Sequence, residues 1–192
     1  MFLASRCPGC DRPGPAPCRE CVKLLRPSAP IAPLPGVTAC RAVLDYEGIA
    51  RDLVARVKYR NQRQILVWLA RAMTRLVEPG AADVVTWAPT TPARRRARGF
   101  DHAELLARRV GRGLGLPAVR LLDRVEGPAQ TGGTRSQRWA APSFSPRVPV
   151  SGLTVIVVDD VITTGATMAA AASALRRGGA AAVVGLAAAH TR

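Results

Sequence analysis

The chain has 192 residues, enough for one α/β domain with a small appendage, and 48% of them are hydrophobic, enough for a sizeable core. The formal net charge of +15 predicts an anionic partner larger than a small phosphate, such as nucleic acid or an acidic protein surface; a solvated basic surface without a partner is the alternative. No N-terminal apolar run reaches signal-peptide length, and Arg176 and Arg177 interrupt the apolar C-terminal region. We therefore expect a soluble cytoplasmic protein.

Two CxxC pairs stand near the N-terminus, Cys7 with Cys10 and Cys18 with Cys21. Four thiolates can converge on one ion, and a tetrahedron of four cysteines is a common structural zinc site. Disulfides are the competing interpretation, but a reducing cytoplasm disfavours them. A thioredoxin-like redox pair would lie between a strand and a helix, whereas these cysteines are surrounded by proline and glycine. We predict a zinc knuckle over residues 1–26 that folds with its metal.

A proline-rich stretch follows, and it predicts an extended linker over residues 27–38. The remainder, residues 39–192, is expected to form the main domain. Its first predicted strand runs from Cys40 to Tyr46, with Cys40 as a small core residue and not a metal ligand. The spacing of apolar residues further predicts helices around 49–57 and 66–77 and a strand over 83–88.

Arginine fills four of the five positions 94–98. Asp101, with a glutamate three residues later, resembles a capping box, so a helix is expected to begin there and the arginines to lie in a loop. Guanidinium groups meet phosphate oxygens bidentately, which makes Arg94 and Arg98 candidates to contact a pyrophosphate or a nucleic-acid backbone. A disordered basic loop is the alternative. His102 could act as a base, but a surface position is expected for it.

The segment from Gln130 to Ser145 carries Arg135, Gln137 and Arg138 among glycine, serine and proline. This composition is compatible with a loop over a ligand site and equally with a surface strand. The sequence does not decide between them.

The most informative stretch covers residues 155–167. Its four β-branched residues, Val155 to Val158, predict a strand covered on both faces. The strand is expected to end at Asp159 and Asp160, because neighbouring carboxylates in mid-strand would place one in the core. A hydroxyl-rich loop then opens a helix expected to end at Arg177, and backbone N–H groups at such a start hold a phosphate. The loop residues are Thr163, Thr164, Gly165, Ala166 and Thr167.

Gly178 and Gly179 end this predicted helix, and Ala181 to Ala189 predict a last strand. Alternating strands and helices with right-handed crossovers predict a parallel sheet flanked by helices, with the phosphate loop at its carboxyl edge. The stretch is not a Walker A loop, because no lysine follows its glycine, and it is not GxGxxG.

An acidic pair followed by a Thr/Gly loop resembles the fingerprint of type I phosphoribosyltransferases, which bind 5-phosphoribosyl-1-pyrophosphate (PRPP). The resemblance implies that Thr163 to Thr167 take the 5′-phosphate. It also implies that Asp159 and Asp160 face the ribose 2′- and 3′-hydroxyls as catalytic residues, and that Mg²⁺ accompanies the pyrophosphate. An ordinary strand-turn-helix with a threonine-rich cap is the alternative.

The whole chain resembles the competence-associated ComF family. The motifs that carry the resemblance are, in order, the four-cysteine knuckle, Val57-Lys58-Tyr59, Arg94-x-x-x-Arg98-Gly99-Phe100, Gln130-Thr131 with Arg138 and Phe144, and Asp159-Asp160. Asp101 and His102 replace the usual Asn-Gln pair, and Ala141 replaces an asparagine. These departures leave the phosphate loop intact.

By this resemblance, the chain is a phosphoribosyltransferase-like protein that binds PRPP or a ribose phosphate and is linked to DNA uptake or DNA processing. Single-stranded DNA or a DNA-processing protein is the implied partner. As an enzyme it would transfer the phosphoribosyl group to an unidentified acceptor. The alternative is a non-catalytic sensor, or a scaffold for nucleic acid or a helicase partner, on the same fold.

Overall fold

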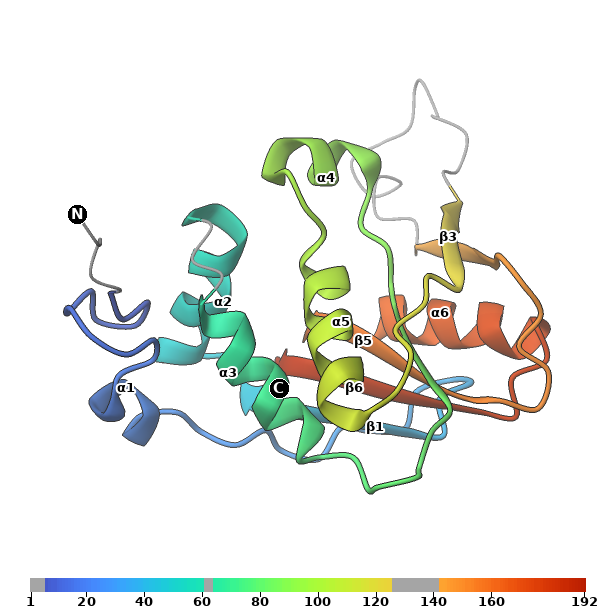
Figure 1. Ribbon diagram of the computed structural model, residues 1–192, viewed down its shortest axis with the longest axis horizontal. Coiled ribbons are helices and arrows are strands. Elements are labelled where there is room, and N and C mark those ends of the chain that lie inside the picture. Colours follow the sequence, from blue (N-terminus) through green and yellow to red (C-terminus); the bar gives the residue numbers. More distant parts are fainter. Residues whose placement is uncertain (1–5, 61–63, 126–141) are drawn as a thin grey trace.

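The protein has an α/β architecture (Figure 1). This computed structural model describes residues 6–60, 64–125 and 142–192. Its elements, in chain order, are α1 (Arg19–Lys23), β1 (Ala39–Asp45), α2 (Gly48–Arg60), α3 (Gln64–Thr74), β2 (Val84–Trp87), α4 (Pro92–Arg98), α5 (His102–Leu114), β3 (Leu122–Val125), β4 (Ser143–Pro146), β5 (Thr154–Ile162), α6 (Ala166–Arg177) and β6 (Ala182–His190). In the described part of the chain, no helix has the length and apolar character needed to cross a membrane.

The main sheet has four parallel strands in the order β1-β6-β5-β2. Parallel neighbours need crossover connections, which the helices supply, so the predicted α/β fold with a parallel sheet is confirmed. β3 and β4 form a separate antiparallel ribbon. The end of the undecided segment is thus strand β4, whereas its residues Gln130, Thr131, Arg135, Gln137 and Arg138, and also Ala141, lie outside the described residues.

Helices cover both faces of this sheet. Ile156 and Val158 of β5 pack with α3 and α5, while Val155 and Val157 pack with α6. Figure 1 shows α3 and α5 on one side of the strands and α6 on the other. Because side chains alternate between the faces of a strand, burial on both faces explains the uninterrupted apolar run.

Strand β5 is longer than the sequence predicts. It continues through Asp159 and Asp160 to Ile162, because its pairing with β6 persists to that residue. Its pairing with β2 stops earlier, at Val158. Both carboxylates are therefore only half-buried, and the expected end of the strand at the aspartates is wrong.

The arginine cluster forms a short helix, α4, and the expected loop is wrong. Thr91 caps the helix by accepting a hydrogen bond from the Arg94 N–H at 3.2 Å, and Pro92 occupies the first turn. Gly99 ends it with a φ of 77°. Arginine is a good helix former, and Arg94, Arg95 and Arg96 are exposed, so water weakens their mutual repulsion.

The proline-rich segment 27–38 contains no helix or named strand, and it lies against the domain. The N–H of Ser28 donates to the Val43 carbonyl at 3.0 Å, and the N–H of Ala29 donates to Asp45 Oδ1 at 3.1 Å. Further along, Leu34 packs against the cluster on the α6 side. These contacts hold the segment along β1 and beside α6.

Leu186 tests the core between the sheet and the α3/α5 layer, where it is completely buried. We expect Leu186→Ala to lower the free energy of unfolding by about 2–5 kcal/mol, because truncation leaves a cavity among close-packed neighbours. Urea unfolding followed by circular dichroism measures the change. The matched control is Val148→Ala at a 49% exposed site, which should cost less than about 0.5 kcal/mol. Equally small losses in both variants would contradict this core.

Candidate functional site

A cavity of about 270 Å³ lies at the carboxyl ends of β5 and β2. Parallel α/β sheets bind ligands at this edge, because the loops there diverge and leave a crevice. Here one wall is acidic and comes from β5, whereas another is basic and comes from α4 and β3. The lining includes six residues singled out from the sequence: Asp159, Asp160, Thr163, Thr167, Arg94 and Arg98.

The acidic pair is ordered by its own backbone. The N–H of Asp160 donates to Asp159 Oδ1 at 2.8 Å. The side chains of neighbouring strand residues point to opposite faces of a sheet, yet Asp159 and Asp160 both line one cavity. This arrangement is feasible because β2 pairs with β5 only as far as Val158, so no described strand covers that edge of β5 beside the two carboxylates.

Within the threonine loop, Thr163 to Thr167, Gly165 has a φ of 76° and is the N-cap residue of helix α6, so Ala166 and Thr167 form the first turn of that helix. A Cβ at this position would overlap the side chain of Leu34, so both the conformation and the space favour glycine. Gly165 has no side chain that could cap α6, and the Ala166 N–H donates to the Thr164 hydroxyl at 3.4 Å. The N–H groups of this first turn lie where a helix start binds an anion. Thr164, Gly165 and Ala166 belong to the loop but not to the cavity lining.

The cavity residues that were not assigned to this site from the sequence include Tyr46, Asp101, His102 and Arg124. The surface position expected for His102 is wrong, since the side chain is only 3% exposed. Its ring centroid lies 4.7 Å from that of Phe100. His102 also lies beside Leu66 and Leu69 of α3, so residues distant in the sequence contribute to its burial.

Asp101 joins two parts of the cavity wall. Its Oδ1 accepts from the Ala103 N–H at 3.0 Å, and its Oδ2 accepts from the Thr90 N–H at 2.9 Å. Burial raises the pKa of this carboxyl group, although the backbone N–H groups partly offset the effect. The capping residue predicted from the sequence therefore also fixes the loop after β2 to the start of α5.

Arg124 of β3 adds a third guanidinium group to the cavity. It lies 5.5 Å above the Phe144 ring and donates to the Pro89 carbonyl at 3.4 Å. Arg124 is a single arginine in a short strand, and nothing in the surrounding sequence indicates that it would line the cavity. The cavity therefore combines cationic and anionic walls, which suits a ligand with phosphates at one end and hydroxyls at the other.

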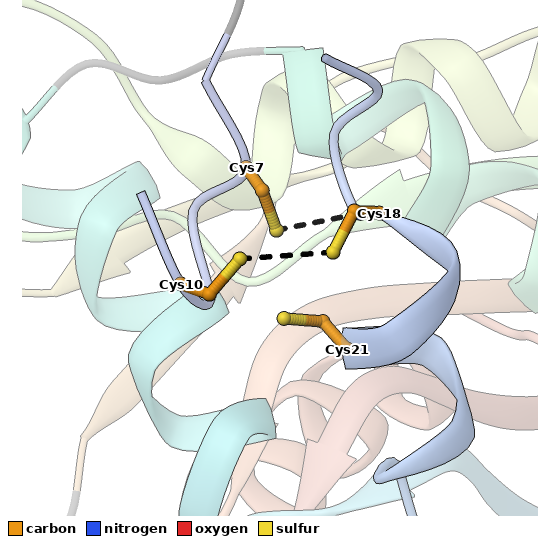
Figure 2. Close-up of side chains that lie close together, drawn as sticks. All are labelled: Cys7, Cys10, Cys18 and Cys21. Carbon is orange, nitrogen blue, oxygen red and sulfur yellow. Dashed lines mark hydrogen bonds between the residues drawn. The ribbon is translucent and has the colours of Figure 1, made fainter. Parts of the chain in front are cut away.

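The four cysteines near the N-terminus also come together, and Figure 2 shows their sulfurs turned toward a common centre. All four sulfurs lie within 4.8 Å of one another, and those of Cys10 and Cys18 are 3.7 Å apart. A tetrahedral Zn²⁺ with bonds of about 2.3 Å places its sulfurs about 3.8 Å apart. The cluster thus fits zinc. Cys40 lies outside it, and burial raises the pKa of that thiol to about 11.

The chemistry of the cluster also suits a metal. Burial alone would raise the pKa of the Cys7 thiol, but N–H groups of Cys18 and Gly9, at 3.3 and 3.4 Å from its sulfur, contribute to lowering it to about 6. Burial and the neighbouring sulfurs raise the pKa of the Cys21 thiol, so Cys7 is the thiol of this pair that ionises first. The thiolate is the form that binds metal. A partly exposed salt bridge of 3.1 Å joins Asp11, beside the cluster, to Arg56 of α2.

Comparison with known proteins places this geometry in context. Residues 97–192 match the sequence model of a protein family that is described as "Phosphoribosyl transferase domain". Among solved structures, the chain is similar to the glutamine PRPP amidotransferase of B. subtilis, with 24% identity and a TM-score of 0.46 over 64% of this chain and 26% of that chain.

Two further solved structures are similar over most of their own length. The purine phosphoribosyltransferase of Pyrococcus horikoshii Ot3 has 17% identity and a TM-score of 0.42, over 62% of this chain and 71% of that chain. The adenine phosphoribosyltransferase of Leishmania tarentolae has 17% identity and a TM-score of 0.42, over 86% of this chain and 71% of that one. The chain spans only about a quarter of the B. subtilis enzyme. No curated protein matches it.

The cysteine cluster predicts stoichiometric zinc in the purified protein, measured by elemental analysis. We expect Cys21→Ser to weaken zinc binding by more than about tenfold in competition with a chelator, because one of four thiolate ligands is lost. Cys40→Ser is the matched control and should bind zinc normally. Unchanged zinc content in Cys21→Ser would contradict the assignment, as would a folded, metal-free protein in which both Cys7 and Cys21 can be alkylated.

Proposed function

The chain belongs to the phosphoribosyltransferase domain family, whose model matches half of its length, and we propose that its cavity binds PRPP through the ribose-5-phosphate moiety. The observation that carries this proposal is the convergence of the acidic pair, the threonine loop and the arginines of α4 on one cavity. These groups come from segments about 60 residues apart, so only the fold brings them together.

Each part of PRPP has a complementary wall. The N–H groups at the start of α6 and the hydroxyls of Thr163 and Thr167 take the 5′-phosphate. The carboxylates of Asp159 and Asp160 accept hydrogen bonds from the ribose hydroxyls. The guanidinium groups of Arg94 and Arg98 face the pyrophosphate, whose charge they balance.

The same groups suit phosphoribosyl transfer. When an acceptor attacks the anomeric carbon, the bond from that carbon to pyrophosphate breaks, and pyrophosphate leaves with the electron pair. The ribose gains oxocarbenium character, which the carboxylates of Asp159 and Asp160 stabilise, while the arginines stabilise the leaving group. Mg²⁺ on the pyrophosphate would neutralise part of its charge, and carboxylate oxygens are ligands that this ion accepts.

A second candidate function is a ligand sensor or scaffold that contacts nucleic acid or a helicase partner without group transfer. It is favoured by the net charge of +15 and by the cysteine cluster, since neither is needed to bind a ribose phosphate. Release of pyrophosphate in the presence of a panel of bases and amines distinguishes the two candidates. Release with any acceptor supports the transferase, and binding without release supports the sensor.

Within the family, we propose that the chain is ComF-like, with a role in DNA uptake or DNA processing. The support is the order of its parts: a four-cysteine cluster, an arginine-rich segment, and an acidic pair with its threonine loop. We also propose the cytoplasm as its location, because a reducing compartment keeps such cysteines available for zinc.

The acidic pair is tested by isothermal titration calorimetry with PRPP and Mg²⁺. We expect Asp159→Asn/Asp160→Asn to bind at least about tenfold more weakly, because hydrogen bonds from the ribose hydroxyls to charged carboxylates are lost. The control Asp52→Asn/Glu78→Gln removes two exposed acids elsewhere and should bind like wild type. Absence of PRPP binding by the wild-type protein would overturn the transferase and the sensor alike.

The arginine helix is tested by comparing two ligands. Arg98→Gln should weaken binding of PRPP by about tenfold and leave binding of ribose 5-phosphate nearly unchanged, because only PRPP carries the pyrophosphate. Arg96→Gln is the matched control, since Arg96 lies on the same helix but does not line the cavity. An equal loss for both ligands would show that Arg98 does not contact the pyrophosphate.

A further inference from the structure

A second hollow, the α3/α5 groove, runs between helices α3 and α5 and has a volume of about 280 Å³. Its lining combines three arginines, Arg71, Arg109 and Arg112, with the apolar side chains of Val67 and Ala70. Ala70 is buried, whereas Val67 is 43% exposed, so Val67 supplies the exposed apolar surface of a groove that is otherwise lined by cationic groups. The PRPP proposal does not use this groove.

The groove is separate from the PRPP cavity. The two share no lining residue. The cavity takes Ala103 at the start of α5, and the groove takes Arg112 near its end, which are about 14 Å apart along a helix that rises about 1.5 Å per residue. A ligand in the groove would therefore leave the cavity free.

Close packing shapes one end of the groove. A Cβ added to Gly113 of α5 would lie 2.8 Å from Thr74 Cγ2 of α3. The two helices thus approach closely there, and a side chain at this position would force them apart. The shape of the groove is consequently a property of the helix pair and not of one flexible side chain.

All charged side chains described in the lining of the groove are cationic. No aspartate or glutamate lines it in the part of the chain that the structure describes. On the same helix, Arg108 is neutralised by Glu104 at 2.9 Å, but no described ion pair joins Arg71, Arg109 or Arg112 to a carboxylate. Guanidinium groups without a carboxylate are suited to an acidic ligand.

We propose that the α3/α5 groove binds an acidic peptide segment of a partner protein, one that carries an apolar side chain between its carboxylates. The arginines receive the carboxylates, and Val67 receives the apolar side chain. A nucleic-acid strand fits less well, because none of the described lining residues is an aromatic side chain on which a base could stack. A small phosphate would leave Val67 uncovered.

The test uses the full-length, zinc-containing protein and a fluorescein-labelled peptide of repeating Glu-Leu-Asp-Glu units, with binding followed by fluorescence anisotropy. We expect saturable binding that weakens with salt. Arg71→Gln/Arg112→Gln should bind at least about tenfold more weakly, and the charge-matched control Arg19→Gln/Arg51→Gln within about twofold of wild type. Circular dichroism verifies that both variants remain folded.

Two further arms separate this proposal from general attraction between charges. The same peptide with serine in place of leucine should bind more weakly, and Val67→Ser should reduce that difference. Binding that is absent, or equally weakened in both arginine pairs, overturns the proposal. The proposal is also overturned if the leucine and serine peptides bind equally well. Selective loss of oligothymidylate binding in Arg71→Gln/Arg112→Gln would overturn it too, and would assign the groove to nucleic acid.

Discussion

The unequal pairing of β5 is the constraint on which the site depends. β2 pairs with β5 as far as Val158, whereas β6 pairs with it as far as Ile162. Within the described residues, the last part of β5 therefore has no paired strand on its β2 side, and the two adjacent carboxylates of Asp159 and Asp160 line the same cavity. A longer β2 would close this edge and bury one of them at a high cost in free energy.

Around this edge, the surrounding segments are held by contacts between distant parts of the chain. Asp101 binds the backbone after β2 to the start of α5, and Arg124 approaches from the β3–β4 ribbon. The segment that follows the cysteine cluster bonds to β1 and places Leu34 against Gly165. The four-cysteine cluster and the threonine loop thus belong to one packed structure, although they lie at opposite ends of the sequence.

The features that the sequence predicted correctly are those with a local cause. Apolar runs and glycines specify the parallel sheet and helix α6, and the spacing of the CxxC pairs specifies the sulfur cluster. The incorrect expectations concern features set by distant partners: pairing with β6 extends β5, and residues of α3 contribute to the burial of His102. Helix α4 was also predicted incorrectly, but its cause is local. Thr91 and Gly99 cap this helix, and the expected repulsion among its arginines had favoured a loop.

A crystal structure of the protein with ribose 5-phosphate will show whether the loop at the start of α6 is the phosphate site of a PRPP-binding cavity. We expect the phosphate at the N–H groups of the first turn of α6, with the ribose hydroxyls within hydrogen-bond distance of Asp159 or Asp160. A phosphate bound elsewhere, such as in the α3/α5 groove, with the threonine loop vacant, would contradict this assignment.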